Sequence, residues 1–344
     1  MKSWLVILII ICFIVAGTIL LNSCKKNKFI TATPIQFVNP PGFPQSTYNF
    51  SANPLTEEGF LLGKKLFYDG KLSSTGNVYC GSCHQPVAAF TTFDHDRSHG
   101  INGNHTLRNA PGIFNMAWYP YFNQDGNTNS LWKVYENHIN HPKEMGETVS
   151  NVLNKLQADT AYKRMFLAAF GSESITSERM YKALDQFVVS LVSANTKYDK
   201  VMQGQESFTA TEQSGYITFQ SKCGSCHKGV LFTDFSFRNI GLEVDPALND
   251  YGRMRVTNNH SDSIKFRVPS LRNLEFTSYY FHDGRINFPR NVLKFYETGV
   301  NQSATLDPLL TNGIQLTQTE EDNVIDFLRT LSDSAFLSNP RFRQ

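Results

Sequence analysis

The sequence predicts a mainly helical protein that is built from two similar units with long loops. Apolar residues recur at helical spacing in several segments, whereas long runs with the alternation typical of strands are absent. The same five-residue pattern, Cys-x-x-Cys-His, occurs at 80–84 and again at 223–227. A segment of helical periodicity precedes each copy, which indicates duplication of one unit.

The helical segments can be placed in order along the chain. Apolar residues at helical spacing begin after Thr56 and lead to the first Cys motif, and a similar helical pattern begins at Thr211 before the second motif. Between them, 149–156 has amphipathic spacing, and 175–198 predicts one long helix. Thr317 begins a capping box, Thr-x-x-Glu, that predicts the start of the last helix.

The Cys-x-x-Cys-His pattern is the signature of covalent c-type haem attachment. Its two thiols meet the two vinyl groups of one haem, and the adjoining His becomes the proximal iron ligand. A structural zinc site or a redox dithiol does not require a His directly after the second Cys. The sequence therefore predicts two covalent haems and a mainly α fold of two cytochrome c-like domains. The attachment residues are Cys80, Cys83, Cys223 and Cys226, and the iron ligands are His84 and His227.

The N-terminal residues have the features of a secretory signal. Lys2 precedes an apolar run over 4–21, and small residues precede Cys24. We expect a lipoprotein signal peptide over 1–23, lipidation of Cys24, and a Pro-, Thr- and Asn-rich tether over 24–53. The alternative is an uncleaved membrane anchor. Both place the chain on the periplasmic side of a bacterial membrane, where c-type haem is attached.

The rest of the chain is long enough for two small domains with cores of their own. We expect an N-terminal domain over 54–203 and a C-terminal domain over 204–344, each with one haem. The formal net charge of +2 gives no reason to expect nucleic acid as a partner.

Several motifs, in order over residues 55–331, resemble those of the bacterial dihaem cytochrome c peroxidases and their MauG-like relatives. They are Leu-Gly-Lys-Lys-Leu-Phe-Tyr-Asp at 62–69, Ala-Phe-Thr at 89–91, Arg-Asn-Ala-Pro at 108–111, Pro-Lys-Glu-Met-Gly at 142–146, Leu-Phe-Thr-Asp at 231–234, Phe-Arg-Val-Pro-Ser-Leu-Arg-Asn at 266–273 and His-Asp-Gly-Arg at 282–285.

The resemblance implies that peroxide reacts at the N-terminal haem. Glu144 stands where these enzymes keep an acidic residue that moves protons as the O–O bond breaks. The alternative is a solvated loop carboxylate. In the peroxidases a His caps this iron in the oxidised state, and His99 lies nearest that spacing, with His95 and His105 in the same loop. The alternative for all three is an exposed loop histidine.

The resemblance also implies the surroundings of the C-terminal haem, which passes electrons on. Tyr296 stands at the sixth-ligand position, where MauG-like proteins have Tyr and peroxidases have Met; the alternative is a ring packed on the haem edge. Arg267 matches an Arg that could pair with a haem propionate. A calcium ion would take the Asn109 side chain and the backbone carbonyls of Thr277 and Tyr279.

Three positions depart from the family pattern. Gln124 replaces the usual Trp between the haems, which is a candidate electron relay, and Trp118, Tyr121, Phe122 or Trp132 could substitute for it. Val134 replaces a distal Gln. His138 replaces a Pro, six residues before Glu144, and is a candidate proton donor or iron ligand; the alternative is a partly buried loop His.

The expected function is reduction of hydrogen peroxide to water with electrons from a small donor protein, a cytochrome c or a cupredoxin. One alternative is a MauG-like oxidase that acts on a partner protein. Another is a dihaem electron carrier without catalysis. A homodimer is usual in the family that the chain resembles.

Overall fold

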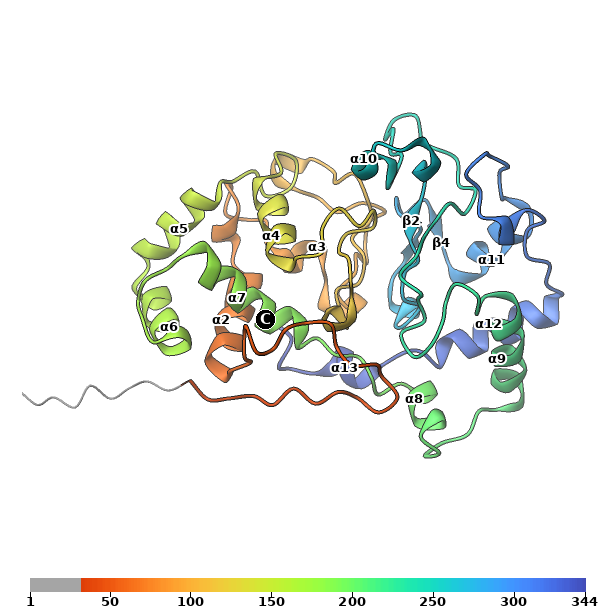
Figure 1. Ribbon diagram of the computed structural model, residues 1–344, viewed down its shortest axis with the longest axis horizontal. Helices are drawn as coiled ribbons and strands as arrows, with labels where there is room; N and C mark the ends of the chain where they lie inside the picture. Colours follow the sequence, from red (N-terminus) through yellow and green to blue (C-terminus); the bar gives the residue numbers. More distant parts are fainter. Residues whose placement is uncertain (1–31) are drawn as a thin grey trace, which may run out of the picture. The chain divides into compact units, whose positions relative to one another are not determined.

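The computed structural model describes residues 32–344, which form one compact unit (Figure 1). The predicted signal peptide and Cys24 lie outside the described residues. The described part is mainly helical, which confirms the predicted fold class. Its α-helices are α2 (Glu57–Phe67), α3 (Cys80–Cys83), α4 (Leu131–Asn140), α5 (Val149–Ala158), α6 (Thr160–Phe170), α7 (Ser177–Val189), α8 (Lys197–Met202), α9 (Ala210–Lys222), α10 (Met254–Thr257), α11 (Pro289–Thr298), α12 (Gln318–Arg329) and α13 (Ser334–Ser338).

The strands are short, as the sequence predicts. β1 (Phe237–Arg238) pairs with β2 (Phe266–Arg267), and β3 (Tyr279–Tyr280) pairs with β4 (Ile286–Asn287), both antiparallel. Short 3₁₀ turns fill several of the remaining loops. Within residues 32–344, no helix is both long enough and apolar enough to span a bilayer.

Two closely packed helix pairs organise the two halves of the chain. α2 packs against α7, and α9 packs against α12 (Figure 1). In each pair a glycine allows the backbones to approach. A methyl group at Gly63 would lie 1.9 Å from the Ala183 carbonyl oxygen, and one at Gly215 would lie 1.8 Å from the Asn323 carbonyl oxygen. The weak repeat in the sequence therefore corresponds to a repeated helix crossing.

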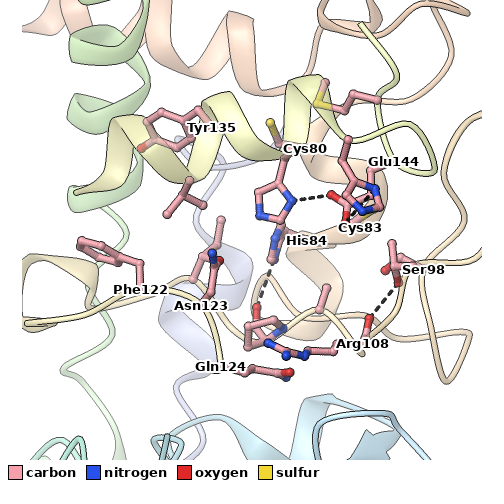
Figure 2. Close-up of a pocket in the computed structure, with 18 of the residues that line it drawn as sticks. Cys80, Cys83, His84, Ser98, Arg108, Phe122, Asn123, Gln124, Tyr135 and Glu144 are labelled. Atoms are coloured by element: carbon pink, nitrogen blue, oxygen red, sulfur yellow. Dashed lines mark hydrogen bonds and ion pairs between the residues drawn. The ribbon is translucent and has the colours of Figure 1, made fainter. Parts of the chain in front are cut away.

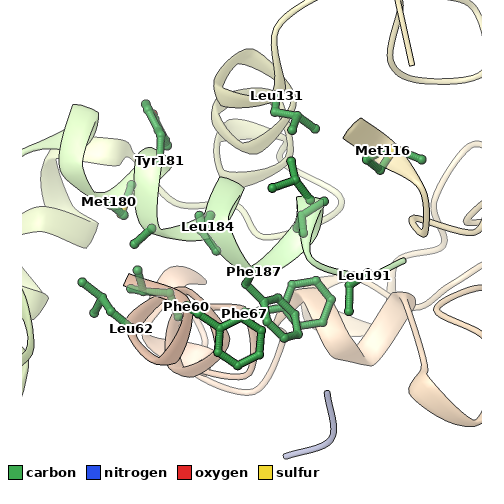
Figure 3. Close-up of a cluster of buried hydrophobic side chains, with 14 of the residues drawn as sticks. Phe60, Leu62, Phe67, Met116, Leu131, Met180, Tyr181, Leu184, Phe187 and Leu191 are labelled. Atoms are coloured by element: carbon green, nitrogen blue, oxygen red, sulfur yellow. The ribbon is translucent and has the colours of Figure 1, made fainter. Parts of the chain in front are cut away.

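The apolar residues form two clusters. The larger cluster includes Phe60, Phe67, Leu184 and Phe187, which interleave between α2 and α7 (Figure 3). It also takes in Phe336, on α13 near the end of the chain. The smaller cluster lies mainly between α9 and α12 and is rich in aromatic residues: Tyr198, Phe219, Phe232, Leu293, Val324, Phe327, Leu328 and Leu331. The domain boundary at residue 203 stays a prediction.

Helix starts follow the capping signals. Thr56 caps α2 by accepting a hydrogen bond from the Gly59 amide, and Thr317 caps α12 in a capping box with Glu320. The helix predicted from Thr211 begins instead at Ala210. Thr209 is its N-cap, because its hydroxyl and the Glu212 carboxylate satisfy each other's backbone amides.

The long helix predicted over 175–198 is wrong in its second half. α7 ends at Val189, and the chain then runs extended as far as α8. The Asn115 side chain hydrogen-bonds both the amide and the carbonyl of Ser193, at 2.9 and 3.0 Å, and Asp333 accepts a hydrogen bond from the Asn195 amide. These hydrogen bonds to distant residues take the place of hydrogen bonds within a helix. The helix therefore ends at Val189, although apolar residues continue at helical spacing through Leu191.

Residues 32–53, expected as part of a tether, have almost no regular structure but lie against the larger cluster. The Phe43 ring packs on Trp118, with ring centroids 5.0 Å apart. The amides of Thr47 and Tyr48 both donate to the Ala117 carbonyl. This Pro-rich segment is therefore held by side-chain packing and by single backbone bonds, rather than by secondary structure.

Candidate functional site

Each Cys-x-x-Cys-His motif borders a large cavity. The first motif, with Cys80, Cys83 and His84, lines a cavity of about 540 Å³, and the second lines one of about 320 Å³. Figure 2 shows Cys80, Cys83, His84 and Glu144 gathered around the first cavity. The thiols of both motifs are free. We refer to these as the N-terminal and C-terminal cavities.

Both motif histidines are oriented by backbone carbonyls. His84 Nδ1 lies 3.1 Å from the carbonyl oxygens of Phe90 and Pro111, and His227 Nδ1 lies 3.0 Å from that of Phe232. With Nδ1 donating, Nε2 is left as the free nitrogen. Burial lowers the pKa of His84 to about 4 and also lowers the pKa of His227. Both imidazoles are therefore neutral at neutral pH, which is the form that binds a metal.

The N-terminal cavity also contains an acid–base pair. His138, on α4, hydrogen-bonds through Nδ1 to the Glu144 carboxylate, and both side chains line the cavity. His141 Nδ1 lies 3.6 Å from the other Glu144 oxygen. The bond at Nδ1 leaves His138 Nε2 as the nitrogen available to the cavity.

The two groups stabilise each other's charged form. Burial raises the pKa of Glu144, but the positive charge and hydrogen bond of His138 outweigh it and hold that pKa below its usual value. Burial lowers the pKa of His138, but the Glu144 carboxylate outweighs it and holds that pKa above its usual value. Near neutral pH the pair therefore favours an ionised carboxylate beside a protonated imidazole.

A short turn after α4 places Glu144. The amides of Glu144 and Gly146 both donate to the His141 carbonyl, at 3.0 and 2.9 Å. Gly146 has φ of +56°, and a methyl group there would lie 2.2 Å from the end of the Ile101 side chain. The Pro-Lys-Glu-Met-Gly stretch thus folds Glu144 back toward the helix that carries His138.

The C-terminal cavity has a different lining. Tyr296, on α11, and His282 line it together with His227. The Phe266 ring stacks on the His282 ring, with centroids 3.9 Å apart. Burial, followed by the neighbouring Cys223 and Cys226, raises the pKa of the Tyr296 phenol.

Five residues line both cavities: Asn109, Ala110, Pro111, Gln124 and Arg267. We call them the shared wall. In it, Gln124 Nε2 donates to the Asn109 carbonyl, at 3.1 Å, and the Arg267 guanidinium lies over the Tyr119 ring. Gln124 Oε1 and Arg267 Nη1 are buried without a hydrogen-bond partner among the described residues. Of the residues 32–344, none that lines both cavities is aromatic.

The predicted calcium residues all line the C-terminal cavity. Asn109 Nδ2 donates to the Asp96 carbonyl at 2.8 Å, which leaves Oδ1 as its free acceptor, and the Thr277 hydroxyl lies 3.2 Å from the Tyr279 carbonyl. Residues 32–344 contain no group of three or more His, Cys, Asp or Glu side chains arranged for a metal. A calcium site here would depend on amide and carbonyl oxygens, and it stays a prediction.

His99 does not line the N-terminal cavity. It is exposed, and its ring contacts those of His95 and His105, with centroids 4.3 and 4.4 Å apart. Its neighbour Ser98 lines the cavity instead.

Sequence reasoning missed Arg108 and Tyr135, which also line the N-terminal cavity. Arg108 forms ion pairs with Asp125 and Asp250, at 2.7 and 2.6 Å. The partners of Arg108 are distant in sequence, so no local pattern could reveal them. Tyr135 lies three residues before His138 on α4, so helical spacing places it on the same face.

A family model and several known proteins match this chain. The family model described as di-haem cytochrome c peroxidase matches residues 57–207. A methylamine utilization protein MauG from Methylorubrum extorquens is 34% identical over 294 residues, which cover 84% of this chain and 82% of the relative.

The chain belongs to the di-haem cytochrome c peroxidase and MauG family. A cytochrome c551 peroxidase from Nitrosomonas europaea is also 34% identical, over 78% of this chain and 80% of the relative. The crystal structure of a MauG-like protein associated with microbial copper homeostasis superposes with a TM-score of 0.83 at 31% identity, covering 90% of this chain and 98% of that one. The chain is therefore a peroxidase-like oxidoreductase, and two c-type haems are its cofactors.

The cavities fit these cofactors. Each offers two free thiols and an imidazole whose Nε2 is unused, and both volumes lie in the range of about 300–1,000 Å³ that is usual for ligand sites. The unpartnered Arg267 Nη1 supplies a buried positive donor, as a haem propionate requires.

Proposed function

We propose that this protein reduces hydrogen peroxide to water in the N-terminal cavity. The observation that carries this is the His138–Glu144 pair, which lies in the same cavity as Cys80, Cys83 and His84. An electron carrier has no need of an acid–base pair in the cavity beside its haem, whereas peroxide reduction requires protons at that position.

The proton movements can be assigned to the pair. Peroxide takes up two electrons and two protons to give two water molecules. The ionised Glu144 accepts a proton from one peroxide oxygen, and the protonated His138, through Nε2, donates a proton to the other oxygen, which leaves as the first water. Glu144 then returns its proton and solvent supplies one more, so that the remaining oxygen leaves as the second water. When bound, the haem iron supplies the electron-transfer chemistry that breaks the O–O bond. The hydrogen bond at His138 Nδ1 keeps the imidazole oriented between these steps.

We further propose that the C-terminal haem, held by His227 with Tyr296 as its second ligand, receives electrons from a small donor protein. Tyr296 lines the same cavity as His227, so the two side chains would hold the iron of one haem between them. Arg267 would pair with a propionate in the shared wall. Phenolate ligation stabilises ferric iron, so this haem would have a low potential.

A direct test is the stoichiometry of turnover. The half-reduced holoprotein is mixed with hydrogen peroxide and a reduced cytochrome c, and peroxide loss and donor oxidation are followed together. The proposal predicts two donor molecules oxidised per peroxide. Peroxide loss without donor oxidation, or neither, would refute it.

The second candidate is a MauG-like oxidase that removes electrons from a partner protein. The observation that favours it is Tyr296 in the C-terminal cavity, where the MauG-like proteins have Tyr. Against it stands the shared wall, which offers Gln124 rather than an aromatic relay between the haems. Oxidised side chains on a co-purified partner, in the absence of any small donor protein, would favour this candidate.

The resemblance supports further parts of the same proposal. They are a calcium ion bound by Asn109, Thr277 and Tyr279, a homodimer, and a periplasmic location with a lipid anchor at Cys24. Calcium analysis of the purified protein, its mass in solution, and lipid labelling of a Cys24→Ser variant test these parts separately.

A further inference from the structure

A row of three aromatic side chains leads from the N-terminal cavity to the protein surface. Tyr135 lines the cavity, Tyr181 is 7% exposed, and Trp132 is 47% exposed. The ring centroids of Tyr135 and Tyr181 are 6.2 Å apart, and those of Tyr181 and Trp132 are 6.3 Å apart. Both separations lie within the range of about 4.5–7 Å for aromatic rings in contact. Tyr135 is labelled in Figure 2 and Tyr181 in Figure 3.

The tyrosine at the cavity has a carboxylate beside it. Tyr135 Oη and Asp185 Oδ1 are both buried without a hydrogen-bond partner among the described residues, yet each lies close enough to perturb the pKa of the other. The other Asp185 oxygen accepts a hydrogen bond from the Tyr48 hydroxyl at 3.1 Å. Asp185 is thus held by Tyr48 through Oδ2, and its other oxygen, Oδ1, is free to accept a proton from the nearby Tyr135.

This arrangement suits the oxidation of a tyrosine. A phenol that loses an electron becomes strongly acidic, so it gives up an electron easily only where a base can take its proton. Burial raises the pKa of Asp185 to about 7, which makes it a better base than an ordinary carboxylate. Trp132, at the other end, needs no such base, because the residue is 47% exposed and water can take its proton.

We propose that Trp132 is a surface oxidation site for aromatic one-electron donors, connected to the N-terminal cavity through Tyr181 and Tyr135. This inference rests on the proposed function, because peroxide must be reduced in that cavity. It adds an electron entry that avoids the shared wall, in which Gln124 occupies the place of the usual aromatic relay. The half-exposed Trp132 offers ring surface that a phenol or an arylamine can contact, beside the Lys133 ammonium, whose Nζ lies over the ring at 5.6 Å from its centroid.

The electrons and protons balance as follows. Tyr135 releases one electron into the cavity and its phenol proton to Asp185. An electron from Trp132 crosses the Tyr181 ring, which lies between the two, and restores Tyr135, whose proton returns from Asp185. Tyr181 keeps its own proton, because its buried hydroxyl has no hydrogen-bond partner among the described residues to take it. The surface donor loses one electron, so two donor molecules are oxidised for each peroxide that becomes two waters.

The first experiment treats the holoprotein with hydrogen peroxide and no donor, then maps oxidised residues by peptide mass spectrometry. The expected result is added oxygen on Trp132 but not on Trp118, which is only 2% exposed. Tyr135→Phe lowers the oxidation of Trp132 several-fold, since phenylalanine is not readily oxidised. Tyr181→Leu also lowers it several-fold, since it removes the ring that lies between Tyr135 and Trp132. Tyr251→Phe is the matched control, because Tyr251 is a partly exposed ring that lies outside the row and lines neither cavity.

The second experiment uses the aromatic dye ABTS as the donor. Trp132→Phe is expected to lower its oxidation at least about tenfold, while the absorbance change that peroxide alone produces keeps its rate. A normal absorbance change that leaves Trp132 unmodified would overturn the relay alone. The same conclusion would follow if Trp132 were oxidised equally in the wild-type protein and in the Tyr135→Phe and Tyr181→Leu variants. No absorbance change in the wild-type protein would overturn the proposed function and the relay with it.

Discussion

The N-terminal and C-terminal cavities have the same haem-attachment motif and share one wall, but they differ in the ionisable side chains that line the rest of each cavity. In both, a Cys-x-x-Cys-His motif is followed by a loop whose carbonyl fixes the imidazole at Nδ1. The N-terminal cavity then offers the His138–Glu144 pair, whereas the C-terminal cavity offers the Tyr296 phenol. Under the proposed function, the side chains that line each cavity, rather than the attachment motif, would divide reaction from electron transfer.

The largest expected effect comes from removing the acid–base function of the N-terminal cavity. Glu144→Gln keeps the size of the side chain but cannot accept a proton, so we expect peroxide turnover to fall by about 10²–10⁴-fold. Steady-state peroxide consumption measures this. Glu173→Gln, at an exposed position between α6 and α7, is the control and should leave the rate unchanged. An unaltered rate in Glu144→Gln, at normal haem content, would contradict the assignment of the pair.

The next effect tests the C-terminal cavity. Tyr296→Met replaces an oxygen ligand with a thioether, which favours ferrous iron, and should raise the potential of that haem by on the order of 100 mV. Spectroelectrochemical titration resolves the two haems. Tyr280→Phe, which lines the same cavity and loses only a hydroxyl bonded to backbone carbonyls, should shift the potential much less. Equal potentials in both variants would leave Tyr296 as a packing residue.

A smaller effect, on stability, is expected at the two helix crossings. Gly63→Ala and Gly215→Ala each place a methyl group against a backbone oxygen of the partner helix, and each should lower the free energy of unfolding by about 1–3 kcal/mol. Denaturant unfolding of the holoprotein measures this. Gln213→Ala, exposed on α9, should stay within about 0.5 kcal/mol. If only one glycine proves sensitive, the two crossings are not equivalent.

The smallest effect is a pH dependence that belongs to the N-terminal half. The pKa of Asp185 is raised to about 7 in the folded protein, so between its unfolded value and pH 7 the folded state binds the extra proton. Stability should therefore fall as pH rises across that window, by up to a few kcal/mol, and level off above it. Asp185→Asn should flatten this part of the curve of unfolding free energy against pH. An identical curve for the two proteins would show that Asp185 titrates normally.

Local signals in the sequence account for much of this structure. Capping residues such as Thr56 and Thr317 located helix starts, because a cap depends on neighbours within one turn. The haem motifs are likewise local, and Cys80, Cys83 and His84 lie together on the cavity as their spacing requires. The resemblance to the family also singled out Glu144, which does line that cavity, and its role there stays a prediction.

The features that sequence analysis did not predict depend on contacts between residues that are far apart in the chain. The end of α7 at Val189 is set by Asn115 and Asp333, neither of which is near it in the chain. The bond between His138 and Glu144 depends on a turn held by Gly146, and the exposed position of His99 depends on how its loop folds. The shared wall joins Gln124 to Arg267 across more than a third of the chain, so its composition emerged only from the fold.

The most direct test of the contrast between the cavities is low-temperature electron paramagnetic resonance of the holoprotein before and after mixing with hydrogen peroxide. The account predicts a high-spin ferric signal that disappears with peroxide, from the N-terminal haem, beside a low-spin signal from the C-terminal haem. Two low-spin signals that ignore peroxide, in both the oxidised and the half-reduced protein, would contradict it, because neither cavity would then be open to a substrate.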